Sequence, residues 1–199
     1  MTLREIVKNN RSRREYIGNI RIPRDLLLEW IDNARLTPST VNIQPLKYII
    51  ADSDADCSYI RSHVHFAGKL PDYSGPDKDH SPSAYIVIVT DKTLAPNIEP
   101  FDKDVGIAAQ TILLSATEAG FGGCMIGAFD FKPICEYYRL GDDLVPRLII
   151  SLGKPDDESV RVETEDIDKD GDITYYRSGG VHHVPKRKLD DIIIHRSDL

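Results

Sequence analysis

The segment from Asp102 to Phe129 constrains the fold of this chain more than any other. Between Asp104 and Ala119, apolar and small residues recur at three- and four-residue steps with no interrupting proline. The spacing predicts a buried helix of about 17 residues, which is about 25 Å long. We expect Asp102 and Asp104 to supply N-cap and helix-dipole interactions at its N-terminus and Gly120 to end it in a left-handed conformation. Its small residues would let it pack against a sheet and against a second copy of itself; an ordinary core helix is the alternative.

The size and composition of the chain limit its function. It has 199 residues, 41% of them hydrophobic, which is enough for one domain over residues 1–199. The formal net charge of -7 disfavours nucleic acid and anionic membranes as partners, because both require a basic surface. Three cysteines lack metal-ligand spacing, so we expect reduced thiols and no metal. The N-terminus lacks a signal-peptide core and no apolar run could span a bilayer, which predicts a cytoplasmic protein.

Helical and strand-like patterns alternate imperfectly along the chain, which predicts an α+β fold with a central sheet wrapped by helices. Apolar faces and β-branched runs predict helices at 23–35, 54–66 and 133–139 and strands at 46–51, 84–90, 147–152 and 190–195. The segment from Gly68 to Ser83 is rich in Gly, Pro and Asp and is predicted to be a long loop. Loops of this length in compact domains are often functional.

The acidic segment from Glu163 to Asp172 imitates a calcium-binding loop. Its aspartates at 166, 168 and 170 and its glycine at 171 fit an EF-hand, but Arg177 occupies the twelfth position, where a glutamate is needed. We therefore predict a solvated β-hairpin over 163–176 that turns at Asp170-Gly171. A calcium-binding interaction protein remains a remote alternative. His63 and His65 lack a third ligand nearby and are expected to be packed or solvated histidines.

Several common catalytic motifs are absent. The glycines after Gly120 follow a helix and precede an apolar run, the reverse of a dinucleotide fingerprint. The chain has no phosphate loop, G-x-S-x-G elbow or H-E-x-x-H helix. It does have basic triplets near both ends, formed by Arg11, Arg13 and Arg14 and by Lys186, Arg187 and Lys188. If the ends meet, they form an anion site; two solvated basic faces are an equal alternative.

Six motifs in order along nearly the whole chain resemble those of the nitroreductase family of flavin mononucleotide (FMN) enzymes. They are the opening at Arg11–Tyr16, the loop at Pro38–Pro45, the helix start at Asp104–Gln110, the glycine run through Ile126-Gly127, and the LGKP and PKR segments ending at Pro155 and Arg187. The resemblance implies a nitroreductase-like layered fold with a mixed or antiparallel sheet. It also implies an intertwined homodimer with two flavin sites at its interface.

The resemblance further assigns roles to individual residues. The FMN phosphate and ribityl chain would be held by Asn10, Arg11, Ser12, Lys186 and Arg187. Arg14 would lie at the flavin N1 and O2 edge, where a cation raises the reduction potential. The Gly127 N–H would approach N5, within a backbone run of Met125, Ile126, Gly127 and Ala128 along the ring. The partner subunit would contribute Pro38, Ser39, Thr40 and Asn42, with Gln44 supporting that loop.

The sequence departs from the family pattern at three places. Asn10 stands where many relatives have an arginine, so phosphate binding would depend more on Arg11 and the C-terminal basic residues. Leu46 replaces an aromatic residue that often follows the Q-P pair. The predicted hairpin over 163–176 is a local elaboration with no role that the sequence assigns.

The implied reaction is a ping-pong transfer of a hydride from NADH or NADPH to FMN and then to a small acceptor, such as a nitroaromatic or a quinone. A reductive dehalogenase, a flavin-consuming enzyme and a flavin-binding redox module without turnover are the alternatives. The loop from Gly68 to Ser83, with Phe66, Tyr73 and His80 in or beside it, is expected to select the acceptor; a surface loop without ligand contact is the alternative. The sequence leaves the physiological acceptor, the nicotinamide preference and a redox role of Cys124 open.

Overall fold

The computed structural model describes residues 1–68, 70 and 73–194. Within them the α-helices are α1 (Leu3–Asn9), α2 (Arg24–Arg35), α3 (Asp54–Arg61), α4 (Asp102–Glu118), α5 (Phe131–Tyr137) and α6 (Leu189–Ile192). The strands are β1 (Leu46–Ala51), β2 (Ala84–Asp91), β3 (Gly122–Ile126), β4 (Leu144–Gly153), β5 (Arg161–Ile167), β6 (Tyr176–Ser178) and β7 (Val181–Arg187). The predicted α+β class is confirmed.

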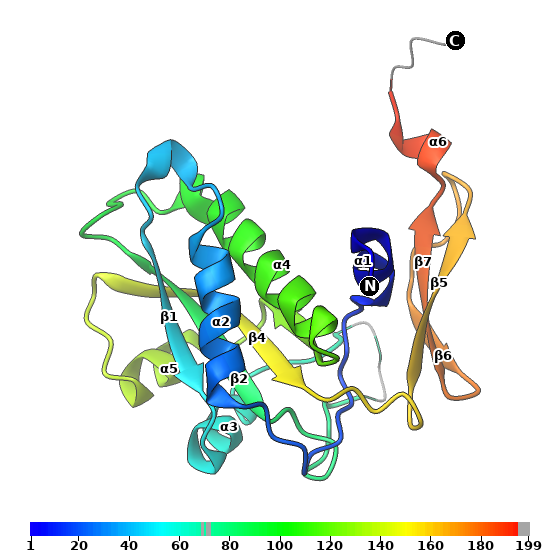
Figure 1. Ribbon diagram of the computed structural model, residues 1–199, viewed down its shortest axis with the longest axis horizontal. Coiled ribbons are helices and arrows are strands. Elements are labelled where there is room, and N and C mark those ends of the chain that lie inside the picture. The colour runs from blue at the N-terminus through cyan, green and yellow to red at the C-terminus, as the bar shows by residue number, and fades with distance from the viewer. Residues whose placement is uncertain (69, 71–72, 195–199) are drawn as a thin grey trace.

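The main sheet is antiparallel, with strand order β1-β2-β4-β3. The apolar run of β2 lies in its interior, where Ile86 and Ile88 belong to a core shared with α2 and α4. Tyr85 and Val87 belong to a second core shared with α3 and α5. Alternate residues of a strand point to opposite faces, so a strand covered on both sides is apolar throughout. The helices therefore form a layer on each face of this sheet (Figure 1).

Helix α4 has the length that its periodicity predicts, 17 residues. Gly120 follows it with a φ of 76°, a left-handed conformation that glycine adopts without strain, so the predicted C-terminus is confirmed. The predicted N-cap is wrong, because Phe101 occupies the cap position and makes no side-chain cap hydrogen bond. Asp102 and Asp104 lie in the first helical turn instead.

Asp104 is buried, and its carboxylate holds the loop that follows α2. Its oxygens accept hydrogen bonds from the Ser39 and Thr40 hydroxyls, each at 2.6 Å, and from the Thr40 backbone N–H at 3.0 Å. Desolvation alone would raise the pKa of Asp104, but the hydrogen bonds from Ser39 and Thr40 outweigh it and lower the pKa. Val41, in the adjoining 3-10 helix, has a φ of 52°, which is strained for a β-branched residue. The carboxylate contacts thus fix a strained loop against α4.

A second, smaller sheet of strand order β5-β7-β6 corrects the prediction for the C-terminal part of the chain. β5 does not pair with β6 as a hairpin over 163–176 requires; it pairs in parallel with β7, and β6 pairs antiparallel with β7. The hairpin turn falls at Gly179 and Gly180, between β6 and β7, where both residues have the positive φ that glycine adopts without strain.

Further boundaries differ from the predictions. Helix α5 spans Phe131–Tyr137, not 133–139. Helix α3 ends at Arg61, not Phe66. The segment predicted as a strand over 190–195 begins instead with the short helix α6, and residue 195 lies outside the described residues. The strand predicted over 147–152 extends from Leu144 to Gly153 as β4, because antiparallel pairing with β2 continues past the apolar run.

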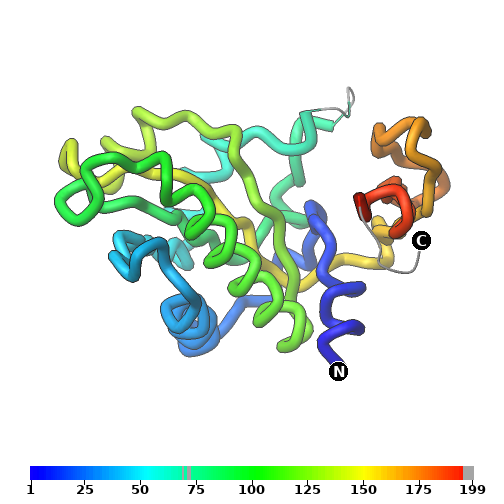
Figure 2. Tube along the Cα trace, turned by 90° about the horizontal axis from the view of Figure 1, so that it is seen from above, coloured from blue at the N-terminus to red at the C-terminus, as the bar shows by residue number. Residues whose placement is uncertain are grey.

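Helix α1 lies between the main body and the β5–β7 sheet in both views (Figures 1 and 2). Val7 of α1 lines the same cavity as Val162 and Val184 of that sheet. The N-terminal segment is therefore in contact with the C-terminal strands.

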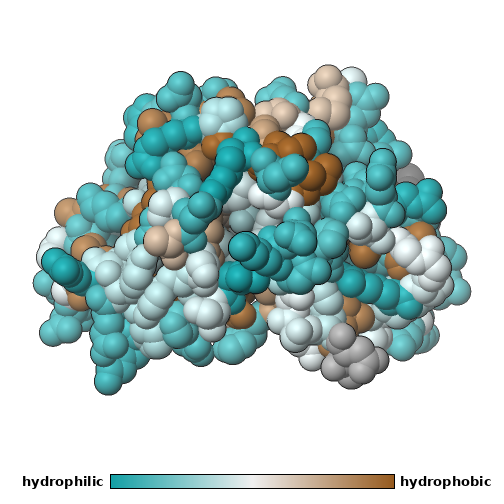
Figure 3. Space-filling view, turned by 90° about the horizontal axis from the view of Figure 1, so that it is seen from below, coloured by the Kyte–Doolittle hydropathy of each residue, from teal (hydrophilic) through white to brown (hydrophobic). Residues whose placement is uncertain are grey.

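Hydrophilic side chains cover most of the face shown in Figure 3, with apolar ones in scattered groups.

The Asp104 contacts predict the effect of Asp104→Asn. An amide has one acceptor oxygen, and its NH₂ group would face donors, so we expect the free energy of unfolding at pH 7 to fall by about 1–3 kcal/mol in urea denaturation. Because folding lowers the pKa of Asp104, its contribution is present above the unfolded pKa of about 3.9 and is lost as the pH falls through the folded pKa. The deficit of the variant should therefore shrink at acid pH.

Asp142→Asn is the matched control, since Asp142 is exposed and only its carbonyl oxygen accepts a hydrogen bond, from Lys92. Its effect should stay within about 0.5 kcal/mol. Equal stability of the two variants at pH 7 would show that Asp104 does not hold the loop.

Candidate functional site

The two ends of the chain meet at a cavity of about 250 Å³. Its wall includes Arg11 and Ser12, which follow α1, and Lys186 of β7. The remaining lining residues are Val7, Asn10, Gln110, Leu113, Gly123, Met125, Val162 and Val184. The basic triplets therefore contribute residues to one place, as an anion site requires. Helix α4 and the edge strand β3 form the opposite side of this cavity.

Arg11 brings an unsatisfied donor to the cavity. Its Nη2 donates to the Val7 carbonyl oxygen at 2.8 Å, but its buried Nε has no hydrogen-bond partner among the described residues. Burial lowers the pKa of Arg11, and neighbouring Arg13 lowers it further. A buried donor without a partner costs free energy, and an anion that accepted from it would remove that cost.

Asn10 and the C-terminal basic residues are arranged differently from one another. The Asn10 side chain donates to Thr117 Oγ1 of α4 at 3.1 Å, so its amide is already engaged where it lines the cavity. Arg187 does not line the cavity; its guanidinium donates to the Lys169 carbonyl oxygen. Lys188 pairs with Asp168 at 2.6 Å. Of the three C-terminal basic residues, Lys186 alone is among the lining residues.

Strand β3 presents a bare main chain at the edge of the sheet. At Gly123, a Cβ would lie 2.2 Å from the Ser151 carbonyl oxygen of β4 and 2.8 Å from Leu113 Cδ2 of α4, so only glycine fits between them. At Gly127, just past the strand, a Cβ would meet nothing within 4 Å, and Ala128 is also exposed. Met125 lines the cavity, whereas the Ile126 side chain is buried in the core on the α3 and α5 side. The backbone near Gly127 is thus open to a ligand.

The loop residues that the resemblance assigns to a partner subunit lie elsewhere. Pro38, Ser39 and Gln44 line a second cavity of about 130 Å³, together with Asp104. Gln44 Nε2 donates to Asn42 Oδ1 at 3.0 Å, and the Gln44 N–H donates to Ser39 Oγ at 3.0 Å. Thr40 is held by Asp104. Within one chain, the predicted FMN residues are therefore divided between two places.

Arg14 contacts the small sheet. Its Nη1 lies 3.3 Å from His182 Nε2 and 3.4 Å from the Ser12 carbonyl oxygen, to which it donates. Its guanidinium carbon lies 5.6 Å from the centroid of the Tyr175 ring. Arg14 does not line the cavity that contains Arg11 and Lys186. It lines a smaller, adjoining cavity together with Ser12, Arg177 and His182.

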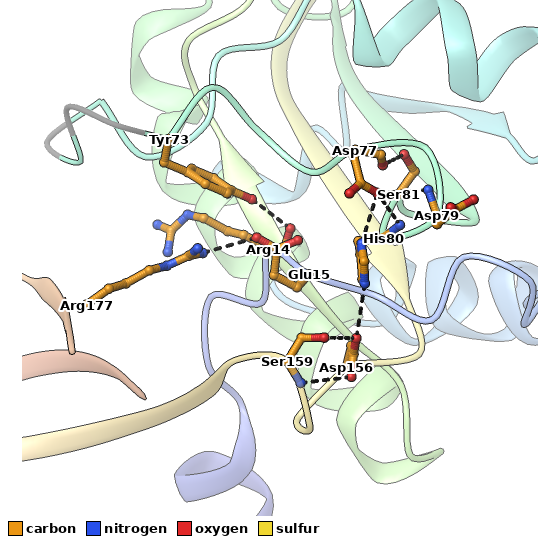
Figure 4. A network of polar contacts seen from close by, with 10 residues as sticks. All are labelled: Arg14, Glu15, Tyr73, Asp77, Asp79, His80, Ser81, Asp156, Ser159 and Arg177. Atoms are coloured by element: carbon orange, nitrogen blue, oxygen red, sulfur yellow. Dashed lines mark hydrogen bonds and ion pairs between the residues drawn. The ribbon is translucent and has the colours of Figure 1, made fainter. Parts of the chain in front are cut away.

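The sequence analysis missed a polar network that joins the long loop to this region (Figure 4). The Tyr73 hydroxyl donates to the Arg14 carbonyl oxygen at 2.9 Å. Arg177 lies 4.3 Å from the Tyr73 ring centroid and donates to Glu15 at 3.3 Å. His80 contacts Asp77 and Asp156. No local pattern predicts these pairs, because their members are more than 50 positions apart, except for His80 and Asp77.

Other parts of the site prediction concern metals, thiols and membranes. Among the described residues, no group of three or more His, Cys, Asp or Glu side chains could hold a metal ion. His63 and His65 both lie 3.2 Å from Asp130. Cys57 and Cys124 are buried free thiols, and burial raises the pKa of Cys124. In the described part of the chain, no helix has the length and hydropathy to cross a bilayer.

Comparison with known sequences identifies relatives of this arrangement. The model of the nitroreductase family matches residues 7–154. The chain is 25% identical over 185 residues to the putative NAD(P)H nitroreductase YdgI of Bacillus subtilis strain 168. That match covers 77% of this chain and 88% of the relative.

Solved structures of nitroreductase family proteins are similar to this chain as well. A nitroreductase family protein from Clostridium novyi NT is 28% identical with a TM-score of 0.68, covering 79% of this chain and 89% of that one. A putative nitroreductase from Exiguobacterium sibiricum 255-15, solved in complex with FMN, has the same fold; it is 21% identical with a TM-score of 0.63, covering 78% and 89%. The motifs, the layered fold and the family match together show that the chain belongs to the nitroreductase family.

Proposed function

We propose that the protein is an FMN-dependent oxidoreductase that takes electrons from NADH or NADPH. The observation that carries this proposal is the cavity in which Arg11, with its unsatisfied buried Nε, meets Lys186 from the other end of the chain. An anion bound there would satisfy both cations. Because the chain belongs to the nitroreductase family, we infer that this anion is the phosphate of FMN.

The residues at this place fit FMN. Arg11, Ser12 and Lys186 would bind the phosphate, and the open backbone around Gly127 leaves room for a flat ring. Glycine lets a main chain approach a ligand closely. When bound, the flavin supplies the chemistry of accepting a hydride and passing electrons to an acceptor. The side chains of this protein would bind and orient the cofactor, and the cation of Arg14 would favour negative charge at the flavin edge.

We also propose that the protein works as a homodimer. Gly106, Ile107 and Gln110 of α4 are exposed on one face, with Ile107 39% exposed. The Val41 side chain is 87% exposed at the tip of the strained loop that Asp104 holds. Backbone strain is retained at functional sites when surrounding contacts fix it. These features support a second copy that covers α4 and receives the loop residues Ser39, Thr40 and Asn42 near its flavin.

For the acceptor, we propose a small nitroaromatic or quinone reduced in a ping-pong cycle. The network around Tyr73 supports a role for the long loop in acceptor choice, because it links this loop to Arg14 and Glu15.

One measurement distinguishes this oxidoreductase from a flavin-binding module without turnover. The yellow protein is mixed with NADH or with NADPH in the absence of oxygen, and the absorbance of the flavin is followed. We expect at least one of the two donors to bleach it; a protein that neither donor bleaches would rule out turnover with nicotinamide donors.

The placement of the basic residues predicts different effects of three substitutions. Arg11→Ala with Lys186→Ala removes both cations from the cavity, so we expect nearly colourless protein and at least a tenfold weaker Kd for FMN in fluorescence titration. Arg187→Ala is the matched control: it removes the same charge from the next residue of β7, outside the cavity, and should change the Kd less than threefold. Equal losses in both proteins would show that the phosphate lies elsewhere.

Gly127 offers a test of the flavin edge. Because a Cβ there meets nothing within 4 Å, Gly127→Leu should fold with a melting temperature close to that of the unsubstituted protein stripped of FMN. The added side chain would occupy the open backbone edge and should lower FMN occupancy at least tenfold, as measured by absorbance near the flavin maximum. Full occupancy with unchanged NAD(P)H oxidation would place the ring at another part of the chain.

A further inference from the structure

Arg14 is a half-buried cation without a counter-charge. No ion pair among the described residues involves it, because the neighbouring acids have other partners: Glu15 pairs with Arg177, and Asp157 pairs with Arg13. Its buried Nε has no hydrogen-bond partner among the described residues. A carboxylate at this place would cancel the charge and hold the side chain firmly. The protein holds it without one.

Neutral groups of the small sheet take the place of a carboxylate. His182 of β7 lies 3.3 Å from Arg14 Nη1 through its Nε2, and the Tyr175 ring, just before β6, faces the same guanidinium at 5.6 Å. Tyr175 and His182 also contact each other, with ring centroids 5.3 Å apart. Both residues lie beyond residues 7–154, the part that matches the family model. The support for Arg14 therefore comes from outside the matched range.

The imidazole is neutral for a structural reason. His182 is 2% exposed, and the groups that face it are the cations Arg14 and Arg177, the neighbouring His183 and the Tyr175 ring. Burial first, and the charges of Arg14 and Arg177 next, lower the pKa of His182 to about 4. A neutral ring whose Nε2 accepts from Arg14 carries its proton on Nδ1, which has no hydrogen-bond partner among the described residues.

We propose that His182, assisted by Tyr175, is a positioning residue that holds Arg14 as an uncompensated cation and thereby favours the anionic reduced form of the bound flavin. The inference rests on the proposed FMN chemistry. A cation that keeps its full charge stabilises a nearby negative charge more than one already paired with a carboxylate does. Neutral acceptor and ring contacts orient the guanidinium without reducing that charge. The small sheet, for which the sequence gives no role, would then raise the reduction potential of the bound flavin.

The test compares the reduction potential of FMN in the dimeric holoprotein and in single variants. His182→Leu keeps the volume but removes the acceptor, so Arg14 is released, and reduced FMN should bind about tenfold more weakly relative to oxidised FMN. For a two-electron couple this is a fall of about 30 mV. His182→Gln keeps an acceptor for Arg14 and should restore most of the potential. Tyr175→Leu should lower it in the same direction by less, and serves if the first variant does not fold.

Two controls separate positioning from general disturbance. His183→Gln alters the adjacent histidine, which contacts Glu165 and stacks on Tyr176, and should leave the potential unchanged. In an Arg14→Ala background, His182→Leu should cause no further fall, because it acts through Arg14. Bound FMN with equal potentials in all variants, or an equal fall with and without Arg14, would overturn the inference and leave the proposed function intact. A wild-type protein that binds no FMN would overturn both.

A second measurement needs no flavin. Since folding lowers the pKa of His182 from about 6.5 to about 4, the folded state binds fewer protons than the unfolded chain between these values, and its stability should fall as the pH drops through that range. His182→Gln cannot take up this proton, so its urea midpoint should fall less from pH 7 to pH 4. Parallel curves for both proteins would show that His182 is not held neutral between the arginines.

Discussion

The close packing of α4 against the edge of the main sheet underlies both the core and the site. Gly123 of β3 has no side chain, so the Ser151 carbonyl oxygen of β4 and Leu113 of α4 can both approach its backbone. Gln110 and Met125 line the cavity beside it. A Cβ at Gly123 would lie 2.2 Å from the Ser151 oxygen, so a larger residue there would force β3 away from β4 and change the cavity wall. The same contact therefore buries apolar surface and shapes a place for a flat ligand.

Electrostatic contacts connect this rigid body to its less regular parts. The Asp104 carboxylate fixes the strained loop at one end of α4. At the other side, Glu15, Arg177, Tyr73 and Arg14 join the N-terminal segment, the small sheet and the long loop. The Asp104 carboxylate and the Glu15–Arg177 ion pair are each held by groups distant in sequence. Buried charged groups need such partners, so their positions are more restricted than those of exposed charges.

Much of the fold could be predicted from local patterns. The 17 residues of α4 and the strand β2 follow from periodicity and apolar runs, since these report which faces are buried. The small sheet could not be predicted in the same way. Asp170-Gly171 is a plausible local turn, but β5 pairs in parallel with β7, and parallel pairing depends on a connection rather than on a turn motif. The predicted cap of α4 failed because the 3-10 helix Glu99–Phe101 runs directly into α4, so that Phe101 occupies the cap position.

For the site, the sequence by itself determined which residue types are available: basic triplets at both ends, a glycine run after a long helix, and a loop between prolines. The residue types and their order along the chain are properties of the sequence and do not depend on how the chain folds. Only the tertiary structure decided that Lys186 shares a cavity with Arg11 while Arg187 does not, and that Arg14 lies against His182. Neighbours on a β-strand point to opposite sides, and contacts across more than 160 positions depend on how the whole chain packs.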